Sequence, residues 1–146
     1  MRELIKQLKM EEENLRILAF KKTIPEDGNI PVSSASVFQT KCWLVSADLS
    51  ILTTRAEVHE GKMKGLREDT LNDKKAESEE KAENAKERFA KSTPEYRAAR
   101  DAYYLATALL NNVNSLKRFF ENGVYVMRSR QDLEARDWSA TPTVEA

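Results

Sequence analysis

The chain has 146 residues, 40% hydrophobic and 33% charged, with equal numbers of acidic and basic side chains and a formal net charge of +0. This length predicts one domain, residues 1–138, and the high charge with only four Gly and four Pro favours long helices over sheets. A zero net charge excludes a global basic field, so any binding of nucleic acid needs a local basic patch.

The same composition bears on location. The single cysteine, Cys42, excludes an internal disulfide framework and fits a reducing, cytoplasmic environment, the host cytoplasm if a phage encodes the chain. No run of about eighteen apolar residues occurs, and the N-terminus is charged from the start. We therefore expect a cytoplasmic protein with neither a transmembrane helix nor a signal peptide, and no membrane partner.

The first predicted element is a helix over about residues 2–22. Its apolar face is predicted to comprise Leu4, Leu8, Leu15 and Leu18. The helix is expected to end before Pro25, because proline cannot continue a helix and disfavours helical geometry in the residue before it. Residues 25–29 then read as a turn and residues 30–32 as an extended segment.

The second predicted element is a long helix over about residues 35–91, capped by Ser33 or Ser34. Its apolar residues recur at alternating steps of four and three, which indicates a coiled-coil seam: Phe38, Cys42, Val45, Leu49, Leu52, Ala56, His59, Met63 and Leu66. Gly61 and Gly65 each cost about 1 kcal/mol in a helix interior, and they either permit close approach of a neighbouring backbone or mark a bend. Residues 67–91 are densely charged and are predicted to form a solvated arm.

The third predicted element is a long helix over about residues 94–135. Thr93 is a suitable N-cap, and Pro94 suits the first helical position. One apolar stripe follows: Tyr96, Ala99, Ala102, Tyr103, Ala106, Leu109, Leu110, Val113, Leu116, Phe120, Val124 and Met127. The short link at residues 92–94 requires this helix to run antiparallel to the second. Residues 139–146 are predicted to be a disordered tail.

These elements predict an all-α fold: a long, coiled-coil-like antiparallel helical hairpin with the short N-terminal helix packed at its base. A slender hairpin has too little internal core to bury every seam residue, so we expect a homo-oligomer.

Signatures of catalysis are absent from the sequence. It contains no phosphate-binding glycine loop, no nucleophile elbow and no Cys or His pair at metal-ligand spacing. The only histidine, His59, and the only cysteine, Cys42, both lie on the seam, where core packing accounts for them. We therefore predict a non-enzymatic protein without metal or cofactor.

Two local features could bind a partner. The first is a basic cluster of Lys62, Lys64 and Arg67 interleaved with glycines, which could either bind the phosphates of a nucleic acid or be a solvated face. The second lies near the C-terminus, where aromatic side chains neighbour arginines and could either stack bases or form a subunit contact. It includes Lys117, Arg118, Phe119, Phe120, Tyr125, Arg128, Arg130 and Trp138.

Several of these stretches carry a family resemblance that spans residues 38–138. They are Trp43-Leu44 early in a long charged helix, the Lys/Arg and Gly cluster after it, Tyr103-Tyr104, and the segment 121–128 after an aliphatic stripe. In this order the chain resembles the UvsY family, small all-helical recombination mediators of large tailed phages. The resemblance implies a homo-oligomeric ring that binds single-stranded DNA, helps displace the single-strand-binding protein and loads a RecA-like recombinase.

Carried onto this chain, the resemblance implies that Lys62, Lys64 and Arg67 contact DNA and that the C-terminal helix is the oligomerisation element. From the residues themselves, Arg128 and Arg130 are further candidates for binding nucleic acid, and the candidate interface residues are Phe119, Phe120, Tyr125 and Trp138. The leading hypothesis is accordingly a phage-type accessory protein in recombination and repair.

The alternative is a helical-hairpin scaffold or interaction protein, such as a phage-encoded inhibitor of a host complex, that does not bind nucleic acid. The neutral net charge and the aromatics between Phe119 and Tyr125 favour this alternative.

Overall fold

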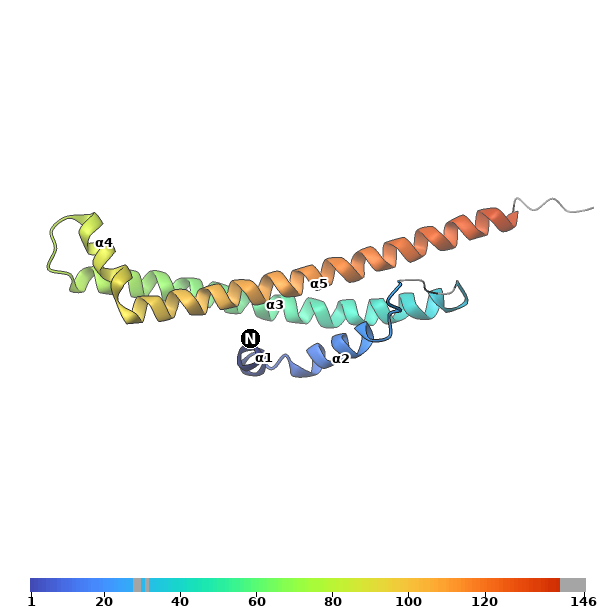
Figure 1. The fold of residues 1–146 in the computed structure, drawn as a ribbon, viewed down its shortest axis with the longest axis horizontal. Coiled ribbons are helices and arrows are strands. Elements are labelled where there is room, and N and C mark those ends of the chain that lie inside the picture. Colours follow the sequence, from blue (N-terminus) through green and yellow to red (C-terminus); the bar gives the residue numbers. More distant parts are fainter. Residues whose placement is uncertain (28–29, 31, 140–146) are drawn as a thin grey trace, which may run out of the picture. The chain divides into compact units, whose positions relative to one another are not determined.

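In the computed structural model of the chain, every secondary-structure element among the described residues is a helix. The backbone is described for residues 1–27, 30 and 32–139, and the side chains for all of these except 32, 33, 124, 126–131, 134, 135 and 137–139. The elements are α1 (Arg2–Gln7), α2 (Glu11–Lys21), α3 (Val32–Glu77), α4 (Glu83–Ser92) and α5 (Pro94–Ser139) (Figure 1). Within the described residues, the all-α prediction is confirmed.

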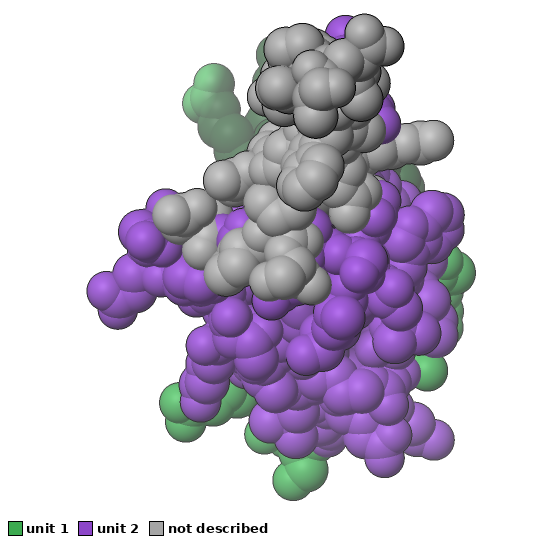
Figure 2. Space-filling model, turned by 90° about the vertical axis from the view of Figure 1, so that its right-hand side faces the viewer, with its two compact units in different colours: residues 1–8, 52–114 green, residues 9–51, 115–146 purple. Residues whose placement is uncertain are grey.

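The chain divides into two compact units, coloured separately in Figure 2. Unit 1 comprises residues 1–8 and 52–114, and unit 2 comprises residues 9–51 and 115–146. Helices α3 and α5 each contribute one segment to each unit.

In unit 1, α3 and α5 pack antiparallel, as the hairpin prediction requires. Arg67 of α3 lies over the ring of Tyr103, and seven residues later Lys74 lies 3.7 Å from Glu95, eight residues earlier on α5. Sequence numbers that rise on one helix while they fall on its neighbour define an antiparallel pair. The buried apolar side chains of this unit are Leu4, Leu52, Ala56, Ala90, Tyr96, Ala99, Ala106, Leu109 and Val113.

The beginning of α5 follows the predicted capping. Thr93 has extended backbone geometry (φ −70°, ψ 145°), and its Oγ1 accepts a hydrogen bond from the backbone N–H of Tyr96 at 3.4 Å. Pro94 then occupies the first helical position. A backbone N–H at this position would have no acceptor within the helix, so its absence in proline costs no helical hydrogen bond. The local sequence therefore determines where α5 starts.

The long charged helix predicted over residues 35–91 is broken. α3 ends at Glu77, residues 78–82 are non-helical, and α4 is a separate short helix. The hydroxyl oxygen of Ser78 accepts a hydrogen bond from the backbone N–H of Glu80 at 3.3 Å, a local alternative to the helical bond. Because Glu77, Glu79, Glu80 and Glu83 repel one another within two turns, a continuous helix is further disfavoured here.

In unit 2, Phe20 of α2 joins three helices. Its ring centroid lies 5.5 Å from that of Phe38 on α3 and 5.4 Å from that of Phe120 on α5. Separations of this size are favourable for tilted aromatic pairs. The other buried apolar residues of this unit are Met10, Ile17, Ile30, Ala35, Cys42, Val45 and Leu49.

The predicted N-terminal helix is also divided, into α1 and α2, with Lys9 in the left-handed region at φ 53° between them. The predicted apolar face was wrong for Leu15 and Leu18, which are exposed, whereas Ile17 is buried together with Phe20. A break at Lys9 resets the helical phase, so that α2 buries a different face from the one that a continuous helix would bury.

Helix α3 passes through Gly61 and Gly65 without interruption. A Cβ atom added at either glycine would meet nothing within 4 Å, so these glycines do not permit a close backbone approach in unit 1. The remaining positions of the predicted α3 seam are buried or half-buried, except for exposed Leu66.

Candidate interaction surfaces

The two reactive side chains of the chain sit in packing positions. Burial raises the pKa of the Cys42 thiol to about 11, so at neutral pH it is protonated and a poor nucleophile. Burial, and then the positive charge of Lys62, lower the pKa of His59 below its ordinary value. Among the described residues, no cluster of three His, Cys, Asp or Glu side chains could hold a metal ion. No helix in the same set is long and apolar enough to cross a membrane.

The predicted basic cluster lies on α3 in unit 1. Lys62 and Lys64 are exposed, whereas the guanidinium of Arg67 lies 4.3 Å from the Tyr103 ring centroid and 4.0 Å from a carboxylate oxygen of Glu68. This cation–π contact holds Arg67 against α5. Two exposed lysines therefore remain as the accessible part of the cluster.

Acidic neighbours also dilute the cluster. Lys64 has Glu60 four residues before it and Glu68 four residues after it, which is the spacing of helical ion pairs. Between residues 55 and 69 the sequence carries four basic and four acidic side chains, apart from His59. The local field of this stretch is therefore close to neutral.

The predicted aromatic interface lies on α5 in unit 2, and only part of it is accessible. Phe119 is 52% exposed and Tyr125 is 75% exposed, but Phe120 is 1% exposed and packs inside the unit. Phe119 and Tyr125 are six residues apart, which places them about 120° apart around the helix, so they do not form one patch. The side chains of Arg128, Arg130 and Trp138 lie outside the described set.

The distribution of charged residues reveals a further surface, which apolar periodicity did not predict. Between residues 32 and 54 the only charged side chains are Lys41 and Asp48, although one third of the whole chain is charged. Asp48 is already paired, since its two carboxylate oxygens accept hydrogen bonds from Arg16 of α2 at 2.9 and 3.0 Å. This part of α3 is thus nearly free of uncompensated charge.

The apolar side chains in this stretch occupy two opposite sides of α3. Cys42, Val45 and Leu49 are buried in unit 2, while Trp43 and Leu44 are 68% and 66% exposed. The exposed side, here called the α3 outer face, comprises Val37, Thr40, Trp43, Leu44, Ala47 and Ile51. A surface helix normally places charged residues opposite its buried stripe, and α3 does not.

A second charge-poor surface lies on α5 in unit 1. No residue between Asp101 and Lys117 is charged. The exposed residues of this stretch within unit 1, here called the α5 outer face, are Tyr104, Leu105, Ala108, Asn111 and Asn112. The sequence signal for both faces is the low density of charged residues in these two stretches. Hydrophobic periodicity does not detect it, because it considers only the positions of apolar residues.

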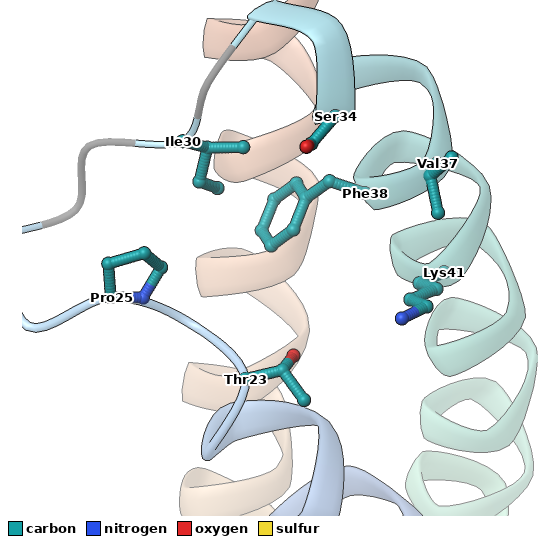
Figure 3. Close-up of a pocket in the computed structure, with 7 residues that line it drawn as sticks. All are labelled: Thr23, Pro25, Ile30, Ser34, Val37, Phe38 and Lys41. Carbon is teal, nitrogen blue, oxygen red and sulfur yellow. The ribbon is translucent and has the colours of Figure 1, made fainter.

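A small pocket of about 350 Å³ lies in unit 2, beside the start of α3 (Figure 3). The ring of Phe38 projects from α3 toward Ile30 and Pro25 in this view. The lining residues are Thr23, Pro25, Ile30, Ser34, Val37, Phe38 and Lys41. They include one cation and no carboxylate or imidazole, so they supply no acid–base pair for catalysis.

Comparison of the chain with protein-family models, with curated proteins and with solved structures finds no match. The resemblance to the UvsY family therefore stays a hypothesis.

Proposed function

We propose that this chain is a non-enzymatic helical scaffold protein, which binds other proteins helix to helix through the α3 and α5 outer faces. The observation that carries the proposal is that both faces are exposed and nearly free of charge, in a chain whose residues are 33% charged.

The chemistry of the two faces supports protein binding. The cores of protein interfaces are depleted in charged residues and enriched in aromatic ones, and exposed Trp43 and Tyr104 lie one on each face. Uncharged helix faces lose little solvation when they are covered by another helix, whereas charged faces would each require a compensating partner. Large exposed apolar areas on an otherwise polar protein mark interaction sites.

The proposal is tested by placing a charge in the α5 outer face. Leu105→Glu introduces a carboxylate into the face, whereas the control Ala98→Glu adds the same charge to an exposed position two turns earlier on the same helix, where Arg97 and Asp101 already make the surface charged. Tagged full-length proteins are incubated with extract of the source organism, crosslinked and analysed by mass spectrometry.

We expect a stoichiometric partner that wild type and Ala98→Glu recover and that Leu105→Glu loses by tenfold or more, since burying an unpaired carboxylate costs more than about 1.4 kcal/mol. Equal recovery by all three proteins, or no stoichiometric partner for any of them, would reject the assignment of this face.

A second candidate function is the binding of single-stranded DNA to assist recombinase loading, with the recombinase and the single-strand-binding protein as further partners. The exposure of Lys62 and Lys64 favours it, together with Arg118 and Tyr125, exposed residues seven apart on one side of α5 in unit 2. Cations beside an exposed aromatic ring can hold a phosphate and stack a base.

This candidate is tested by fluorescence anisotropy with labelled oligo(dT) at low and moderate salt. The double variant Lys62→Glu with Lys64→Glu is expected to weaken binding and flatten its salt dependence, because two phosphate contacts are lost. The matched control is Lys21→Glu with Lys22→Glu, which makes the same charge change on exposed residues at the end of α2. Absence of binding at low salt would eliminate the candidate.

A further inference from the structure

We propose that the α3 outer face pairs with the same face of a second copy of this chain, with the two helices antiparallel about a two-fold axis between residues 45 and 46. The inference rests on the proposed function, since it names the partner of one of the two outer faces. It leaves the α5 outer face for a different protein.

The spacing of residues on the face is that of a coiled coil. Val37, Leu44 and Ile51 recur every seven residues, and Thr40 and Ala47 lie between them, so the steps alternate three and four. All five are exposed in unit 2. In the sequence Val58 continues the same spacing, and it is exposed in unit 1. An exposed seam of this kind requires a helical partner.

The sizes of these residues favour an antiparallel second copy. In that arrangement Leu44 faces Ala47 of the second copy and Ile51 faces its Thr40, so both of these layers combine a large side chain with a smaller one. A parallel pair would place Ala47 against Ala47 and Thr40 against Thr40, so these two layers would be underfilled. A face that alternates large and small residues is thus complementary to itself when reversed.

The two charges flanking the face agree with this orientation. Lys41 and Asp48 occupy equivalent flanking positions one heptad apart, on the same side of the seam. Antiparallel pairing brings Lys41 near Asp48 of the second copy, and the two-fold axis repeats the contact. Because Asp48 also binds Arg16, each Asp48 carboxylate would lie between two cations.

The size of the face sets the expected affinity. The seam from Val37 to Ile51 is about 21 Å long at 1.5 Å per residue, and Trp43 adds a side chain that can bury about 150–250 Å². Such an interface falls near or below the standard size of about 800 Å² per protomer. We therefore expect a dimer with a dissociation constant on the order of micromolar.

Sedimentation equilibrium of the full chain, from about 1 to about 100 micromolar, tests the pairing over the range that such an affinity requires. Leu44→Glu is expected to weaken the dimer about a hundredfold or more, because each dimer loses two buried leucines. Leu15→Glu is the matched control, since Leu15 is 64% exposed on α2 against 66% for Leu44, and it is expected to dimerise like wild type. A monomeric wild type at about 100 micromolar, or equal weakening by both variants, would overturn the proposal.

Disulfide trapping tests the orientation. An equimolar mixture of Thr40→Cys and Ile51→Cys is expected to form a crosslinked heterodimer on mild oxidation, because antiparallel pairing makes these positions face each other. Thr40→Cys alone is expected to stay uncrosslinked, since its two copies would be offset by eleven residues, about 16 Å, beyond disulfide reach. Efficient crosslinking of Thr40→Cys alone would instead establish a parallel pair and overturn the inference. Wild type, with only buried Cys42, is the background control.

Failure of this inference and failure of the proposed function are distinguishable. The dimer depends on Leu44 and is measured with purified protein alone, whereas the protein partner depends on Leu105 and is measured in extract. A monomeric wild type that still loses its partner through Leu105→Glu would reject the second copy while retaining the scaffold function. Binding of a monomeric wild type to neutral phosphatidylcholine vesicles, abolished by Leu44→Glu, would overturn the inference and assign the face to a lipid surface.

Discussion

The packing of unit 2 can be tested with alanine variants at two adjacent residues of α5, Phe119 and Phe120. Phe120 is 1% exposed, and its ring centroid lies 5.4 Å from that of Phe20 on α2. Phe119 is 52% exposed and touches Phe120 edge-on at a centroid separation of 5.3 Å. Alanine at either position removes the same atoms from the same helix, so any difference reports burial alone.

The structure predicts a large difference between the two variants. Truncation of a buried phenylalanine to alanine costs about 3–5 kcal/mol, since apolar transfer energy is lost and a cavity remains. Phe119→Ala loses mainly one aromatic contact, about 0.5–1.5 kcal/mol. A gap of about 2 kcal/mol corresponds to a difference of about 30-fold in the unfolding equilibrium, a large fraction of the stability of a typical domain.

Urea denaturation followed by far-ultraviolet circular dichroism, at one fixed protein concentration, measures this gap. Phe120→Ala is expected to lower the midpoint strongly, and Phe119→Ala only slightly, with unchanged slopes. Equal midpoints, or a lower midpoint for Phe119→Ala, would refute the packing of α5 against α2 through Phe120.

Three further predictions concern single side chains. Burial and then Lys62 lower the pKa of His59, so the unfolded chain takes up its proton at a higher pH than the folded chain. Stability is therefore expected to fall as the pH drops below the ordinary histidine pKa of about 6.5 in wild type, and to fall less in His59→Gln, as measured by urea titration at each pH. The Cys42 thiol, with its pKa raised to about 11, is expected to react with Ellman's reagent far more slowly in the folded chain than in urea; equally fast labelling would contradict its burial. Arg67→Ala is expected to lower the free energy of unfolding by about 0.5–1 kcal/mol through loss of the contact with Tyr103, and a Tyr103→Leu background should remove most of that effect if the contact carries it.

The candidate surfaces show which functional signals a sequence can carry. The sequence shows both outer faces as charge-poor stretches: Val32 to Thr54 carries only Lys41 and Asp48, and Ala102 to Leu116 carries no charged residue. Apolar periodicity identified only the buried seam. Apolar residues spaced three and four apart mark one side of a helix, and this spacing takes no account of the residues on the opposite side. The sequence did not predict which single side chains are accessible to a partner. Phe120 was predicted to lie at an interface but is internal, and Arg67 is held by Tyr103.

What the sequence determined by itself is the set of long helices, the start of α5 at Thr93-Pro94 and the antiparallel direction of the hairpin in unit 1, because capping, periodicity and a short link act over a few neighbouring residues. Tertiary structure alone decided which face of α2 is buried, since the backbone turns at Lys9, a residue without a local signal for left-handed geometry. The end of α3 at Glu77 is a local event instead, since it coincides with the Ser78 hydroxyl bond and a run of glutamates that apolar periodicity does not register. The buried face of α2 depends on which distant side chains meet, and the energy of such contacts is not contained in any local stretch of the chain.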